Sequence, residues 1–150
     1  MCAVAVLPPL GGDFSFTFPP DVRWVRSARE AIRTALGAVS PSSPEKSDLV
    51  EKTTLLTSEV VTNAVVASLN SVRPSPVALY AAWTPAGAVR VSVHDSAPGV
   101  PQPPAGFPLP EDEHGRGLLL IDLYASDWGV CHHTPGPGKL VWFTITGGLR

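Results

Sequence analysis

The stretch "LLTSEVVTNAVVAS", Leu55 to Ser68, is an apolar run into which one carboxylate and one amide are set. Its spacing predicts a helix, on which Glu59 and Asn63 lie one turn apart on the same face. A helical wheel places this pair inside the apolar arc. The hydroxyl side chains fall on the opposite arc: Thr57, Ser58, Thr62 and Ser68. Because a buried carboxylate is costly without a partner, Glu59 is either bonded into a structural network, or turned to the rim of the buried face, or part of a site.

The composition fits a single domain with one hydrophobic core. The chain has 150 residues, of which 44% are hydrophobic and 16% charged, and its net charge is -2. This length is enough to bury one core. No run of Lys or Arg occurs, which argues against direct contact with nucleic acid or a membrane surface. No stretch approaches the roughly 20 apolar residues of a membrane span.

The ends of the chain and its cysteines give further expectations. Residues 1–12, "MCAVAVLPPLGG", are predicted to be a short disordered leader rather than a signal peptide, because no basic segment precedes the apolar residues. A single domain is expected over residues 13–147. Cys2 and Cys131 are interpreted as unpaired thiols of a reducing compartment. We therefore expect a cytoplasmic protein.

Alternating and helical periodicities predict five strands and three helices. The expected strands are Phe14–Phe18, Val77–Trp83, Val89–Asp95, 127–133 and 139–145. The expected helices run from Val22 to Gly37, from about Ser47 to Leu69, and onward from the glycines at 115 and 117. The order is strand, two helices, two strands, a long loop, a helix and two strands. It predicts an α/β fold of two layers, with helices on one face of a mixed, mostly antiparallel sheet.

Asp95 repeats the anomaly of a charge on an apolar face. It continues the row of Val89, Val91 and Val93 on one face of its strand. Directly after it begins a long segment without periodicity, 96–114, and such segments in compact domains are often functional, for example as lids. Asp95 is therefore either a turn-initiating residue that caps the loop or a polar group at the mouth of a site.

The stretch "HGRGLLLI" places Gly115 and Gly117 immediately before a predicted helix. Bare amides at a helix N-terminus attract anions, and glycines let a phosphate approach closely. A flexible hinge into the helix explains the same residues. Neither the P-loop motif nor the dinucleotide-binding glycine motif is present.

Taken in order, the Glu/Asn pair, the inward Asp, the long loop and the glycine-bracketed helix start resemble the GHKL superfamily. This is the ATP-binding fold, called the Bergerat fold, of histidine-kinase catalytic domains, heat-shock chaperones, gyrase and MutL. Within the superfamily the chain is most similar to the bacterial anti-sigma-factor serine kinases and their stand-alone ATP-binding relatives. The resemblance covers roughly Phe14 to Ile145.

The resemblance implies a role for each motif and implies ATP and Mg2+ as cofactors. "SEVVTNAV" resembles the N-box, in which Glu59 would be the general base and Asn63 a magnesium ligand. "VHDSAPGV" resembles the first glycine box, in which Asp95 would take the adenine amino group, with Gly99 in the turn behind it. "HGRGLLLI" resembles the second glycine box, which would hold the phosphates with these residues: Gly115, Arg116, Gly117 and Leu118, the last starting the helix.

Two departures from the family pattern concern the adenine site. Ala97 stands where a glycine is usual, and Leu140 stands where a Thr commonly helps to hold a water at the base. Leucine cannot make that hydrogen bond, so these departures predict a modest nucleotide affinity.

The resemblance thus implies a Mg-ATP-binding regulatory domain of the anti-sigma-factor serine/threonine protein kinase type. It would phosphorylate or sequester a protein partner, a sigma factor or an anti-anti-sigma factor, in transcriptional regulation. The alternative is a non-catalytic nucleotide-binding or partner-binding module on the same fold. A homodimer and ATP turnover are both left open by the sequence.

Overall fold

The computed structural model describes residues 12–38, 44–85, 87–97, 113–132 and 138–146, and the side chains of helix α3 from Leu119 onward. The elements are β1 (Gly12–Phe18), α1 (Arg23–Gly37), α2 (Pro44–Leu69), β2 (Val77–Trp83), β3 (Ala88–Asp95), α3 (Glu113–Tyr124), β4 (Asp127–Cys131) and β5 (Lys139–Thr146). The predicted order of strands and helices is confirmed. Most of the predicted leader, the long loop and its Gly99 lie outside the described residues.

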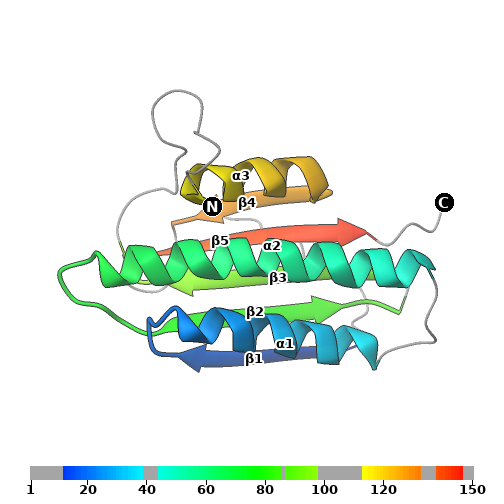
Figure 1. Ribbon diagram of the computed structural model, residues 1–150, viewed down its shortest axis with the longest axis horizontal. Helices are drawn as coiled ribbons and strands as arrows, with labels where there is room; N and C mark the ends of the chain where they lie inside the picture. Colours follow the sequence, from blue (N-terminus) through cyan, green and yellow to red (C-terminus); the bar gives the residue numbers. More distant parts are fainter. Residues whose placement is uncertain (1–11, 39–43, 86, 98–112, 133–137, 147–150) are drawn as a thin grey trace.

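The strands form one sheet in the order β1-β2-β3-β5-β4. Its four pairings are all antiparallel, so the described sheet has no parallel component, and the prediction of a mixed sheet is corrected in this respect. Three helices cover one face, with α2 across the middle over β3, α1 over β1 and β2, and α3 over β4 (Figure 1). The two-layer α/β fold is therefore confirmed.

The core lies between the helices and the inward rows of the strands. The alternation predicted for the central strands is confirmed, because their inward side chains are almost fully buried. These are Val77, Leu79 and Ala81 in β2, Val89, Val91 and Val93 in β3, and Val141, Phe143 and Ile145 in β5. None of the helices in the described part of the chain is long and apolar enough to cross a membrane.

The orientation of α2 differs from the helical wheel. Leu55 is 40% exposed, and Glu59 and Asn63 are half-buried at the rim rather than inside the buried arc. Four hydroxyl residues are buried instead: Thr53, Thr54, Thr57 and Ser68. The reason is that α2 packs on the sheet and contacts both neighbouring helices, so its buried arc is wide and takes up threonine methyl groups. The Thr53 hydroxyl donates back to the Leu49 carbonyl at 2.7 Å.

Two helices begin earlier than predicted. α2 starts at Pro44 rather than near Ser47, because proline is well suited to the first turn of a helix. α3 starts at Glu113, so Gly115 and Gly117 lie within its first turns rather than before it, and Leu118 does not start the helix. A glycine is tolerated inside a helix at a cost of only about 1 kcal/mol relative to alanine.

The prediction of an unpaired thiol at Cys131 is wrong. Cys131 is disulfide-bonded and 4% exposed at the end of the edge strand β4. Cys2, the other cysteine of the sequence, lies outside the described residues. The thiol argument for a reducing compartment therefore does not hold for Cys131.

Candidate functional site

The elements that carry the predicted site residues meet at one end of the domain. β3 ends there, β5 begins there, α2 reaches it with its C-terminal half, and α3 starts from it (the left end in Figure 1). Segments from four separate parts of the sequence thus meet at one end of the strands of the sheet. Of the predicted residues, Asp95 ends β3, and Gly115 and Arg116 lie in the first turns of α3.

Helices α2 and α3 run side by side in opposite directions (Figure 1). The Lys52 ammonium lies 5.8 Å from the centroid of the Tyr124 ring, which joins the early part of α2 to the end of α3. Glu59 lies about two turns beyond Lys52 on the same stripe of α2. At about 1.5 Å per residue in both helices, the first turns of α3 lie level with Glu59 and Asn63. The fold therefore brings the N-box pair beside the Gly115–Gly117 backbone.

The early start of α3 changes which of its amides can hold an anion. The N–H groups of the first three helical residues have no partner within the helix, and in α3 these belong to residues 113 to 115. Gly115 remains a candidate for phosphate contact through the backbone. The amides of Arg116, Gly117 and Leu118 lie deeper in the helix, so phosphate contacts through the backbone of these three residues are the weaker part of the motif.

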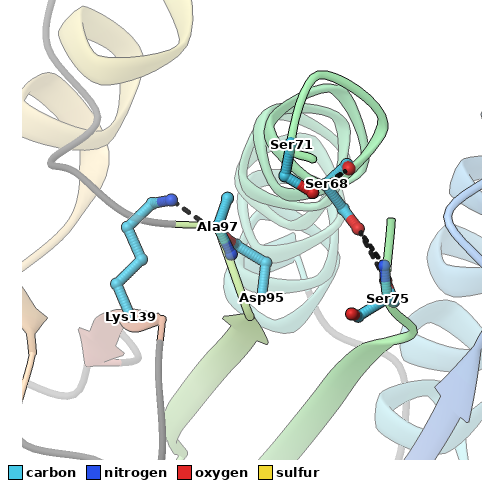
Figure 2. Close-up of polar contacts among 6 residues, drawn as sticks. All are labelled: Ser68, Ser71, Ser75, Asp95, Ala97 and Lys139. Atoms are coloured by element: carbon cyan, nitrogen blue, oxygen red, sulfur yellow. Dashed lines mark hydrogen bonds and ion pairs between the residues drawn. The ribbon is translucent and has the colours of Figure 1, made fainter. Parts of the chain in front are cut away.

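Asp95 is a deeply buried charged group at this end of the sheet. It is 1% exposed, and its Oδ1 accepts hydrogen bonds from the Lys139 ammonium and from the Ala97 N–H, each at 2.9 Å (Figure 2). Its Oδ2 is also buried and has no hydrogen-bond partner among the described residues. A buried carboxylate oxygen without a donor is costly. The unpartnered Oδ2 is therefore an acceptor that is open to a donor from outside the described residues.

The interpretation of Asp95 as a residue that caps the start of the loop is confirmed through its Oδ1. Oδ1 accepts the N–H of the residue two positions later, which is an Asx turn that caps the start of the loop. Oδ2 remains available for a ligand. Ala97 serves the turn through its backbone N–H, so the alanine found in place of the usual glycine is compatible with this geometry.

Lys139 is a site residue that the sequence did not predict. The antiparallel register places it directly opposite Asp95, and its side chain is only 6% exposed. The same register places Leu140 opposite His94, on the face of the sheet turned away from Asp95. The prediction that Leu140 weakens the base site is therefore contradicted, because the side chain that meets the carboxylate is Lys139.

A cavity of about 710 Å³ opens beside this end of β3. This volume is within the range of about 300–1,000 Å³ that is usual for small-molecule sites. Its lining comes from the end of α2 and the loop after it, and from the segment after Asp95: Ala67, Asn70, Ser71, Val72, Arg73, Ser75, Ser96 and Ala97.

A serine cluster holds one wall of this cavity. The Ser68 hydroxyl donates to the Ser75 carbonyl at 2.6 Å and accepts from the Ser75 N–H at 2.9 Å. The Ser71 hydroxyl donates to the Ser68 carbonyl at 2.7 Å (Figure 2). These bonds tie the loop that follows α2 to the last turn of the helix, and so fix the wall opposite Ser96 and Ala97.

The described residues contain no cluster of three His, Cys, Asp or Glu side chains that could hold a metal ion. The half-buried Asn63 offers an amide oxygen, which is a suitable single ligand for Mg2+ when phosphates and water complete the shell. Glu59, one turn earlier on the same side of α2, makes a polar interaction of its own. The Asn63 amide oxygen thus fits a Mg2+ ion that binds together with a phosphate ligand.

Comparison with known proteins gives the family of this fold and site. No curated protein sequence matches the chain. A family model described as the histidine kinase-like ATPase domain matches residues 18–145, a range that contains Glu59, Asn63, Asp95 and Lys139. The match runs from the end of β1 through β5 and covers most of the chain. The chain therefore belongs to the histidine kinase-like ATPase domain family, whose members bind ATP.

Proposed function

We propose that this chain is a Mg-ATP-binding regulatory domain of the anti-sigma-factor serine/threonine kinase type, which acts on a protein partner in transcriptional regulation. The observation that carries the nucleotide part is the Oδ2 atom of Asp95, a buried acceptor without a donor. The amino group of adenine is a donor of the required kind. The partner, a sigma factor or an anti-anti-sigma factor, follows from the sequence resemblance.

In this proposal each part of the site has one task. Asp95 accepts from the adenine amino group, and the first amides of α3 hold the phosphates. Asn63 supplies one oxygen to Mg2+, which when bound neutralises phosphate charge. Glu59 takes the proton from the attacking serine hydroxyl of the partner. The position of Glu59 and Asn63 beside the start of α3 supports this division of roles.

The first test is ATP binding by isothermal titration calorimetry, with and without Mg2+, in the wild type and in Asn63→Ala. We expect Mg2+ to tighten ATP binding by the wild type, and we expect Asn63→Ala to lose most of that gain while still binding ATP weakly. Equal ATP affinity with and without Mg2+ in the wild type would contradict the magnesium role of Asn63. No ATP binding at all would refute the proposal.

The second test is transfer of the γ-phosphate of ATP to a small anti-anti-sigma-like protein encoded beside this chain. We expect a phosphoserine on that partner, formed at least about 100-fold more slowly by Glu59→Ala, because general bases contribute 10²–10⁴-fold to rate. Glu51→Ala is the matched control, since Glu51 is exposed on the same helix. ATP binding without phosphotransfer would favour the non-catalytic module.

A further inference from the structure

The two donors that reach Asp95 from the described part of the chain bind the same oxygen. The Lys139 ammonium and the Ala97 N–H each lie 2.9 Å from Oδ1, and Oδ2 has no partner among the described residues. The rotation of a carboxylate about its Cβ–Cγ bond exchanges its two oxygens. Two donors fixed on one side therefore hold the group in one orientation and determine the direction in which Oδ2 points.

The backbone just before β5 allows Lys139 to lie next to Asp95. Gly138, the residue before it, has a φ of 113°, in the region that favours glycine. A Cβ atom built on Gly138 would lie 2.1 Å from the Asp95 carbonyl oxygen and 2.7 Å from the Ser96 Cα. Only glycine allows β5 to begin this close to the end of β3. The close approach places Lys139 directly opposite Asp95 in the ladder.

A fixed acceptor oxygen discriminates between purine bases at position 6 of the ring. Adenine carries an amino group there, which donates a hydrogen bond to Oδ2. Hypoxanthine and guanine carry a carbonyl oxygen, which would face a carboxylate oxygen without a proton between them. Sites built to bond one such group reject the analogue that lacks it, because the buried polar atom of the site is left unpaired.

We infer that Lys139 is a positioning residue for base recognition, which locks Asp95 so that Oδ2 selects a 6-amino purine. This inference rests on the proposed nucleotide function and adds to it a residue that does not touch the base. Lys139 also neutralises the buried carboxylate. The ammonium occupies Oδ1 at 2.9 Å and leaves Oδ2 as the acceptor that a ligand donor can reach.

The test compares two nucleotides that differ only at position 6 of the purine, ATP and purine riboside triphosphate, by calorimetry. We expect the wild type to prefer ATP by at least about tenfold, as for a hydrogen bond to a charged group. Lys139→Met should reduce this preference at least about fivefold, because the Ala97 N–H alone then holds the orientation of the carboxylate. Lys139→Arg should keep it within about threefold, since it restores a cationic donor. Lys52→Met is the matched control and should keep the full preference.

A second variant, Asp95→Asn, tests the orientation of the side chain at position 95 and keeps Lys139. In Asp95→Asn the two fixed donors require the amide oxygen at the Oδ1 position, so the NH₂ group takes the place of Oδ2 and becomes a donor. We expect this variant to prefer inosine triphosphate, which carries an acceptor at position 6, to ATP. The inversion would not follow from a merely structural role of Lys139.

The outcomes separate this inference from the proposed function. If the wild type binds no ATP, the proposed function fails and the inference fails with it. If the wild type binds ATP but Lys139→Met weakens ATP and purine riboside triphosphate equally, Lys139 is only structural and the inference alone is refuted. Should Lys139→Met fail to fold, Asp95→Asn decides: an unchanged preference for ATP overturns the inference, and a preference for inosine triphosphate supports it.

Discussion

The buried ion pair predicts an unusually large effect of one lysine on stability. In Lys139→Met the apolar stem and its volume are nearly kept, so little packing is lost. What remains is an Asp95 carboxylate that is 1% exposed and that, among the described residues, has only the Ala97 N–H as a donor. Removing one partner of a buried pair typically costs about 3–5 kcal/mol. We expect this loss in the free energy of unfolding, a large part of the roughly 5–15 kcal/mol of a typical domain.

The assay is urea denaturation without nucleotide, because urea adds no salt that would screen charges. Asp95→Asn/Lys139→Met removes both charges and keeps an oxygen for Ala97, so it should recover at least about 2 kcal/mol relative to the single variant. Lys52→Met is the control. Its ion pair with Asp48 is exposed, so it should cost less than about 1 kcal/mol. If Lys139→Met costs no more than this control, the pair is not desolvated and the reasoning is refuted.

Two further variants test the supports of the site. Gly138→Ala should cost at least about 2 kcal/mol of unfolding free energy and weaken ATP binding, because its Cβ would lie 2.1 Å from the Asp95 carbonyl oxygen at a φ of 113°. Ser68→Ala should cost about 1–3 kcal/mol, because it leaves the N–H and carbonyl groups of Ser75 without their buried partner. Both are measured by urea denaturation.

Each of these has a matched control. Gly37→Ala is the control for Gly138→Ala, since nothing lies within 4 Å of a Cβ built at Gly37; equal effects of the two would contradict the close approach of β5. Ser47→Ala is the control for Ser68→Ala, since Ser47 is exposed on the same helix. A loss at Ser68 no larger than at Ser47 would show that the loop does not depend on this serine.

The strands were predictable because a half-buried strand alternates apolar and polar side chains with a period of two. The row Val89, Val91 and Val93 therefore identified its inner face, and with it the inward direction of Asp95. The chain order of strands and helices followed from the same periodicities and from the prolines between them. These features depend on neighbouring residues, which a sequence shows directly.

The rotation of α2 was not predictable from polarity alone. On a helical wheel, Thr57 and Ser68 lie on the polar arc, which predicts that they are exposed. In the structure they are buried, because α2 contacts a helix on each side and the sheet beneath. Threonine carries a methyl group that packs and a hydroxyl that can bond within its own helix, as Thr53 does. Glu59 was consequently placed too deep.

The role of Lys139 was not predictable, because its contact with Asp95 depends on the register between β3 and β5. It follows a glycine at the start of a strand, where a lysine is ordinarily exposed. Only the pairing of β5 with β3 shows that it meets Asp95, which is 44 residues away in sequence. The motif comparison drew attention to Leu140 instead, and a shift of one residue in a strand moves the side chain to the other face.

The strand order of the sheet also determines the stage of folding at which the site forms. β1 reaches its partner β2 across both α1 and α2, and β3 reaches β5 across α3 and β4. Such non-local pairings must close long loops before they gain contacts, so they slow folding. The Asp95–Lys139 contact exists only once the β3–β5 ladder is complete. A nucleotide that needs this contact binds the finished domain, and it therefore stabilises the protein by slowing its unfolding rather than by speeding its folding.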